Sequence, residues 1–170
     1  ATYVEAGGLD AGITGHDWVK ETNSDVEEGG ELIYAKQGLK AVRWVLAVPA
    51  DSEIKSVKDL EGKIISTEMV NLVKNYLKKN KVKARVEFSW GATEAKPPRF
   101  ADAIVDLIET GATLQAHNLR TIDTILTSST KLIANKAAFR DEWKKEKIKE
   151  LSFLLQGAIE GKENVMLMAQ

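Results

Sequence analysis

The chain has 170 residues, 44% of them hydrophobic and 29% charged, which is the balance of a soluble globular protein. Its 24 basic and 25 acidic side chains leave a formal net charge of −1, so no general field draws it to nucleic acid or to an anionic membrane. It has no cysteine, which excludes disulfides, thiolate zinc sites and a cysteine nucleophile, and which fits a cytoplasmic protein.

The first forty residues predict the end of one helix, then strands and a second helix. Ala1–Gly8 is typical of a helix tail with glycines at its stop, so we expect the chain to be a fragment. Leu9–Gly15 is a short apolar run bounded by glycines and predicts a buried strand. His16–Glu21 predicts a helix, and the β-rich segment Glu31–Lys36 predicts another strand.

The middle of the chain alternates strands with helical segments. A helical turn is expected at Ser56–Leu60, and Met69–Asn80 places its apolar residues on one helical face, which predicts a helix. The expected strands are Ala41–Val48, Lys63–Thr67, Arg85–Phe88 and Ala103–Ile108. The last of these is almost continuously apolar, which is typical of a strand covered on both faces.

The rest of the chain predicts a pair of strands, Thr121–Thr127 and Lys131–Ala134, and then the longest helix, Ala137–Ile159. Asn164–Met168 is a candidate for a last strand. Because strands and helices alternate throughout, the fold class is α/β with mostly parallel sheets. Residues 41–118 form a self-contained run and are expected to make one lobe, and the flanking residues 1–40 and 119–170 must then pack together as the other.

One strand–turn–helix segment, Asp106-Leu-Ile-Glu-Thr-Gly-Ala-Thr-Leu114, carries the chemistry. Ligands of open α/β sheets lie beyond the carboxyl ends of the strands, where this turn falls. Free N–H groups at the start of the following helix, with the positive end of its dipole, attract an anion. Thr110 and Thr113 add hydroxyl donors, and Gly111 lets a phosphate approach the backbone. The segment predicts phosphate binding.

Asp106 makes this prediction more specific. Strand alternation places Asp106 on one face with Ile104 and Ile108, so a carboxylate interrupts an apolar row. A buried carboxylate without partners costs several kcal/mol, so Asp106 is expected near the open end of the strand, beside a polar ligand such as vicinal ribose hydroxyls. The residues alone leave open a purely structural interpretation, in which Thr110 is an N-cap, Gly111 a turn residue and Asp106 a capping group.

Several spaced blocks resemble the ATP phosphoribosyltransferase family, the first enzymes of histidine biosynthesis. Residues 101–114, followed by Asn118-Leu119, resemble its phosphoribosyl-diphosphate signature, and residues 2–17 resemble its first-lobe motif. Gly91–Pro97 resembles its Gly-Ser-Val-Glu-x-x-Pro loop with departures at Ala92 and Thr93. Leu132-Ile-Ala-Asn135 and Leu154-Leu-Gln-Gly-Ala158 also match, so the resemblance extends over essentially the whole chain.

The resemblance implies a two-lobed fold of the periplasmic-binding-protein type II and a glycosyltransferase that joins ATP to 5-phosphoribosyl diphosphate and releases pyrophosphate. It places Glu109, Thr110, Gly111, Ala112 and Thr113 on the 5-phosphate and Asp106 on the ribose hydroxyls. The expected nucleotide side and cleft residues are Gly12, Thr14, Gly15, Asp17 and Glu94. Mg²⁺ is expected to arrive with the substrates, without a metal-ligand cluster or a catalytic nucleophile in the protein.

The resemblance also implies a homo-oligomer in the full-length protein, and a first strand and a Pro-Lys-Gly-Arg-type loop ahead of residue 1. A non-catalytic module that binds a small anion or solute on the same fold, or an inactive fragment, remains the alternative. An engineered chain that only reuses the fold would have the same pattern. Trp44, Trp90 and Trp143 lie in apolar patterns and are predicted to be core residues, and Trp18 is predicted to pack rather than to bind.

Overall fold

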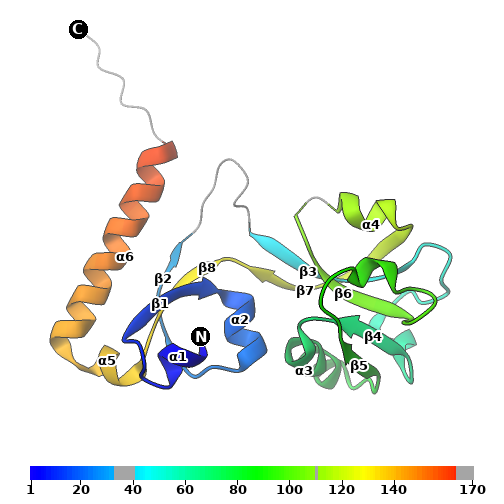
Figure 1. The fold of residues 1–170 in the computed structure, drawn as a ribbon, viewed down its shortest axis with the longest axis horizontal. Helices are drawn as coiled ribbons and strands as arrows, with labels where there is room; N and C mark the ends of the chain where they lie inside the picture. Colours follow the sequence, from blue (N-terminus) through cyan, green and yellow to red (C-terminus); the bar gives the residue numbers. More distant parts are fainter. Residues whose placement is uncertain (33–40, 110, 164–170) are drawn as a thin grey trace, which may run out of the picture. The chain divides into compact units, whose positions relative to one another are not determined.

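The computed structural model describes residues 1–32, 41–109 and 111–163, and they divide into two compact units (Figure 1). The first unit is Ala1–Ala41 with Ser129–Gln170, and the second is Val42–Ser128. The expected strand Asn164–Met168 and most of the expected strand Glu31–Lys36 lie outside the described residues.

The first unit contains a three-stranded antiparallel sheet with the order β1-β8-β2. Its strands are β1 (Ala11–Gly15), β2 (Glu27–Leu32) and β8 (Thr130–Ala134). Its helices are α1 (Thr2–Glu5), α2 (His16–Thr22), α5 (Lys136–Arg140) and α6 (Glu142–Glu163).

Helices cover both faces of this sheet, because successive residues of β8 point to opposite sides. Ile133 forms a buried cluster with Val4 of α1 and Val19 of α2. Its neighbour Leu132 packs on the other side with Ile148 of α6. Gly29 of β2 allows this approach, since a Cβ there would lie 3.2 Å from Cγ2 of Ile148.

The second unit contains a five-stranded mixed sheet with the order β5-β4-β6-β3-β7. Its strands are β3 (Val42–Pro49), β4 (Ile64–Thr67), β5 (Arg85–Phe88), β6 (Ala103–Ile108) and β7 (Leu119–Ser128). Its helical segments are η1 (Val57–Leu60), α3 (Val70–Asn80), η2 (Thr93–Ala95) and α4 (Ala112–Ala116).

Two apolar clusters sandwich this sheet. Trp44 and Leu46 of β3 face α3, where they meet Val73. The alternate residues Val45 and Ala47 face the opposite side, in a cluster with Leu114 of α4 and Ile104 of β6 (Figure 1). Six of the eight residues of β3 are buried, as expected of a strand covered on both faces.

The fold is α/β, as predicted, but its sheets contain less parallel pairing than the pattern suggested. Among the described strands, only β4 with β5 and β4 with β6 pair in parallel. The remaining pairs, including β3 with β6 and β3 with β7, are antiparallel. Periodicity marks each strand but carries no information on the direction of its neighbour, which explains the difference.

The boundary between the units also differs from the expected one. Residues 119–128 were assigned to the lobe that contains the chain ends, but they form β7 and pair with β3 from Val42↔Ser128 to Pro49↔Leu119. Arg120 adds hydrogen bonds from its guanidinium to the carbonyls of Ser52 and Ile54, at 2.8 and 2.7 Å. The second unit therefore ends at Ser128 rather than at residue 118.

Candidate functional site

Asp106 lies in the last half of β6, close to the carboxyl end of the strand. Its register partner on β3 is Val45, and it shares a sheet face with Ile104. The alternation inferred from the sequence is therefore what the structure shows, with a half-buried carboxylate at the end of an apolar row. This is the same face of the sheet that α4 covers.

The pKa of the Asp106 carboxyl is raised above its ordinary value, and burial is the largest cause. The backbone N–H of Leu107 donates to Oδ1 at 2.8 Å and works in the opposite direction, and the negative charge of Glu94 raises the pKa further. The carboxylate is thus partly desolvated and lies near a like charge. A ligand that donates hydrogen bonds to it would relieve this cost.

The turn after β6 has a backbone conformation that favours glycine. Gly111 has φ of +84°, in the left-handed region that residues with a side chain rarely adopt, and it is the N-cap of α4. A Cβ at Gly111 would have no atom within 4 Å, so the space beside this backbone is open. Thr110 lies outside the described residues, whereas Glu109, Ala112 and Thr113 are exposed in the same turn.

Helix α4 is shorter than the sequence argument required for a strong dipole. It has five residues, and the N–H of Gln115 donates to the carbonyl of Gly111 at 3.2 Å. Because the macrodipole is the sum of aligned peptide dipoles, so short a helix contributes little to anion binding. Any phosphate site here therefore depends on the individual N–H groups and hydroxyls of the turn. Leu114, buried against the sheet, fixes the helix in place.

Glu94 comes to Asp106 from a different loop. It lies in η2, which Ala92 precedes with φ of +49°, an unusual value for a residue with a side chain. The buried hydroxyls of Ser89 and Thr93 are hydrogen-bonded at 2.9 Å and hold this loop closed at its base. The structure thus brings Glu94 close enough to Asp106 to raise its pKa. That both residues face one ligand stays a prediction.

The predicted residues of the first unit lie along β1 and at the start of α2. Thr14 pairs with Lys131 of β8, and Gly12 lies so close to α1 that a Cβ would be 3.2 Å from Cγ2 of Val4. Asp17 is only 5% exposed, and its Oδ1 accepts a hydrogen bond from the N–H of Trp18 at 2.9 Å. Its carboxylate folds back over Gly15, where a Cβ would lie 2.1 Å from Oδ1. Asp17 therefore shapes the turn, and Thr14 is more open to solvent.

A cavity of about 600 Å³ lies at the opposite edge of the second unit's sheet. It is lined by residues that follow β3 and precede β6, among them Asp51, Glu53, Asp59 and Asp102. Lys63 also lines it, but its Nζ already pairs with Asp102 at 3.5 Å. An acidic wall of this kind repels phosphate groups, so the cavity is not the site of the anion predicted for the turn after β6.

The predictions for the tryptophans were mixed. Trp44 is buried in the core, with 1% of its surface exposed. Trp90 and Trp143, also predicted as core, are 85% and 66% exposed, and Trp18 is 46% exposed. The neighbours of Trp90 carry a signal for exposure, because Trp90 stands between Ser89 and Gly91, where a loop begins and the apolar row does not continue.

In the described ranges 1–32, 41–109 and 111–163, no group of three or more His, Asp or Glu residues is placed to hold a metal ion. Within the same ranges, no helix is both long and apolar enough to cross a membrane.

Solved structures define the class of fold. The chain superposes with a TM-score of 0.60 on the substrate-binding protein of an amino acid ABC transporter, at 20% identity and over 95% of this chain and 71% of that one. It superposes with a TM-score of 0.78 on the ATP phosphoribosyl transferase (HisG:HisZ) complex from Thermotoga maritima, at 28% identity and over 94% of this chain and 75% of that one. The fold is the two-lobed periplasmic-binding-protein type II.

The sequence family is more specific than the fold. The family model of ATP phosphoribosyltransferase matches residues 1–157, and the chain belongs to this family. It is 60% identical over 167 residues to the ATP phosphoribosyltransferase of Chlorobium phaeobacteroides, and 57% identical over 165 residues to that of Thermodesulfovibrio yellowstonii. These matches cover 98% and 97% of this chain but only 57% and 56% of the relatives.

Proposed function

We propose that the protein transfers a phosphoribosyl group from 5-phosphoribosyl diphosphate to N1 of the adenine of ATP. The products are N1-(5-phosphoribosyl)-ATP and pyrophosphate, in the biosynthesis of histidine. Family membership supports the reaction. The single structural observation that carries it is that Asp106 and the turn at Gly111 lie together at the carboxyl end of β6. They offer a carboxylate for ribose hydroxyls and, next to it, an open backbone turn for a phosphate.

The reaction requires positioning rather than covalent catalysis. The bond between ribose C1 and adenine N1 forms while the bond from C1 to the diphosphate oxygen breaks, and pyrophosphate leaves with the electron pair. Asp106 accepts hydrogen bonds from the ribose hydroxyls, and Glu109, Thr110, Gly111, Ala112 and Thr113 surround the 5-phosphate. Two fixed points on one sugar orient its C1 for attack, and orientation of this kind removes much of the entropic barrier.

The residues present fit a metal ion that arrives on the diphosphate. Mg²⁺ is usually held by one or two carboxylates together with substrate phosphates, and Asp106 and Glu94 are two carboxylates close enough to interact. The ion would offset the charge of the leaving pyrophosphate. On the first unit, we assign nucleotide binding to Gly12, Thr14 and Gly15. Asp17 stabilises the turn that follows Gly15.

Matched glycine substitutions test the site. Gly111 and Gly62 both have positive φ, +84° and +73°, and a Cβ added to either would have no atom within 4 Å, so alanine costs each about 1 kcal/mol through the backbone alone. Gly111→Ala should weaken phosphoribosyl diphosphate binding by about tenfold or more, the loss of one or two charge-assisted hydrogen bonds. Gly62→Ala should leave binding unchanged at the same loss of stability.

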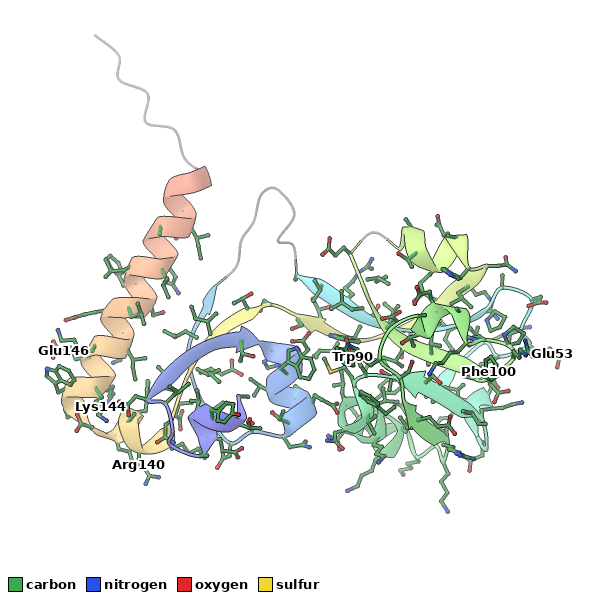
Figure 2. All side chains as sticks on the ribbon, viewed as in Figure 1. Glu53, Trp90, Phe100, Arg140, Lys144 and Glu146 are labelled. Carbon is green, nitrogen blue, oxygen red and sulfur yellow. The ribbon has the colours of Figure 1, made fainter. Side chains whose placement is uncertain are left out.

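Calorimetric titration of the whole protein measures both effects, with Asp106→Ala as the second site variant. Glu53→Gln is its control, because Glu53 is an exposed carboxylate at the far end of the same unit (Figure 2). If neither Gly111→Ala nor Asp106→Ala weakens binding, the site assignment is wrong. Pyrophosphate release from ATP and phosphoribosyl diphosphate separates a transferase from a module that only binds, since the module would bind without release.

The expected homo-oligomer stays a prediction. The Thermotoga maritima relative was solved as a complex of two different chains, HisG and HisZ. Sedimentation of the whole protein alone would show whether it self-associates.

A further inference from the structure

A groove of about 480 Å³ lies on the second unit, where α3 ends and the chain turns into β5. Its floor is apolar and consists of Leu77 and Val82, which are 4% and 6% exposed, together with Ala84. The other residues that line it are all lysines, namely Lys74, Lys78, Lys81 and Lys83. We call this feature the lysine groove.

The end of α3 brings these lysines to one side. Lys74 and Lys78 are one helical turn apart, so they lie on the same flank of α3. Lys81 follows the helix with φ of +56°, and the N–H of Val82 donates back to the carbonyl of Leu77 at 3.0 Å. The chain therefore reverses beside the helix and passes into β5, which packs against α3 (Figure 1). This turn returns Lys81 to the flank that carries the two earlier lysines.

The lysine groove lacks negative charge both in the sequence around it and in its ion pairs. Residues 69–86 contain five lysines and one arginine but no aspartate or glutamate. In the part of the chain that the structure describes, no ammonium group of the groove forms an ion pair. Lysines elsewhere do, since Lys63, Lys131 and Lys144 each have a carboxylate oxygen within 3.5 Å. The excess of positive charge is therefore a property of this groove and not of the chain, whose net charge is −1.

Helix stability explains only part of this charge. Lys78 lies in the last turn of α3, where a cation interacts favourably with the negative end of the helix dipole. Lys74 lies one turn before it, and like charges at this spacing destabilise a helix. Glu61 reaches the turn after α3, but its Oε2 accepts the backbone N–H of Lys83 at 2.8 Å. The repulsion among the lysines is therefore left for a negatively charged partner to relieve.

From this arrangement we propose that the lysine groove is a docking site for an acidic segment of another protein. The segment places an apolar side chain on Leu77 and Val82, with carboxylates on either side of it against the lysines. Burial of the apolar side chain supplies affinity, and complementary charge accelerates association and selects the partner. The proposal is independent of the proposed function, because the groove uses none of the residues assigned to the substrates.

Two other polyanionic partners fit the groove less well. No aromatic side chain lines it, so it offers no platform for stacking the bases of a single-stranded nucleic acid. An anionic membrane is bound by apolar side chains that protrude into it, whereas Leu77 and Val82 are recessed. An acidic peptide is the partner that uses both the apolar floor and the lysines.

A labelled peptide tests the proposal on the whole protein. The probe is Glu-Glu-Leu-Glu-Glu-Leu-Glu-Glu with fluorescein at its N-terminus, and its fluorescence anisotropy reports binding. At about 0.15 M salt, where charges more than about 8 Å apart are largely screened, the wild type should bind the probe saturably. Lys78→Gln should weaken binding by about threefold, and the double variant with Lys81→Gln by about tenfold, the range that exposed ion pairs contribute.

Lys79 provides the matched control, because it is the exposed neighbour of Lys78 on α3 but does not line the groove. Lys79→Gln should bind the probe within about twofold of the wild type at this salt concentration. Lys78→Arg keeps the charge and should also bind like the wild type. Thermal melting of each variant, compared with that of the wild type, shows that it is folded.

The proposal is overturned if the wild type does not bind the probe. Equal losses in Lys78→Gln and Lys79→Gln would also overturn it, because they would indicate a general attraction between charges. A probe with serine in place of leucine should bind at least about threefold more weakly, since it loses apolar burial, and equal binding would contradict a role for the floor. An oligothymidylate of equal charge should bind more weakly than the peptide, and binding as tight or tighter would assign the groove to nucleic acid instead.

Discussion

Asp106 is a carboxylate that the fold keeps partly out of water beside a second carboxylate, Glu94. Its pKa is raised in the folded chain, so between its ordinary value of 3.8 and the folded value the native state binds more protons than the unfolded state. Stability therefore falls as the pH rises through this window and stays lower above it. The ionised form opposes folding at neutral pH and serves binding instead.

Replacing Asp106 with asparagine should consequently raise the melting temperature of the ligand-free protein at pH 7. The gain should shrink as the pH falls toward 3.8 and below, because the aspartate is then increasingly protonated in both states. Calorimetric melting of the two proteins from pH 4 to pH 8 measures this difference. Glu53→Gln, which also removes one carboxylate but from an exposed position, is the control variant. If Asp106→Asn melts at a lower temperature than the wild type at pH 7, the ionised Asp106 carboxylate does not destabilise the folded chain.

For single residues, the sequence predicted which face of the strand carries Asp106, because strand alternation can be read from the local pattern alone. It predicted a turn at Gly111 for the same reason, since a glycine that follows an apolar strand is a local turn signal. It was wrong for Trp90 and Trp143, because an indole in an apolar context is core only if another element covers it. That covering is a property of the tertiary fold.

Among the elements, the long C-terminal helix is divided where the sequence predicted continuity. α5 ends at Arg140 and α6 begins at Glu142, because Asp141 has an extended ψ of 117°. Its Oδ1 accepts a hydrogen bond from the N–H of Lys144 at 3.0 Å, and its carbonyl accepts from Lys145 at 2.9 Å. Asp141 is thus an N-cap. The sequence does carry a signal for a helix start here, because Asp141 is followed by Glu142, but it lies within a continuous apolar periodicity.

Removal of this cap should destabilise the first unit. Asp141→Ala is expected to lower the free energy of unfolding by about 1 kcal/mol, the usual value of an N-cap. Glu146→Ala, on an exposed residue one turn further along the same helix (Figure 2), should change it by less than about 0.5 kcal/mol. Urea unfolding followed by circular dichroism compares the two. Equal effects would mean that Asp141 does not act as a cap.

At the scale of the whole molecule, the second unit is a continuous segment with its own core. Both of its apolar clusters are drawn entirely from residues 42–128. Its ends, Val42 and Ser128, are register partners on β3 and β7, so the segment closes on itself. The sequence could locate β7 but could not show that β3 is its pairing partner. For this reason the predicted boundary fell at residue 118, before β7. Pairing between distant strands depends on the assembled core rather than on local pattern.

This organisation predicts that residues 42–128 fold alone, whereas residues 42–118 do not. The shorter segment lacks β7, which covers one edge of β3, and lacks Arg120, whose guanidinium bonds the carbonyls of Ser52 and Ile54. With Trp90→Phe in both segments, Trp44 is the remaining tryptophan, and it is buried in the core. Its fluorescence should show a cooperative thermal transition in the longer segment and a gradual change in the shorter one. Similar melting of both would show that β7 contributes nothing to the unit, and a gradual change in both would show that the core needs the rest of the chain.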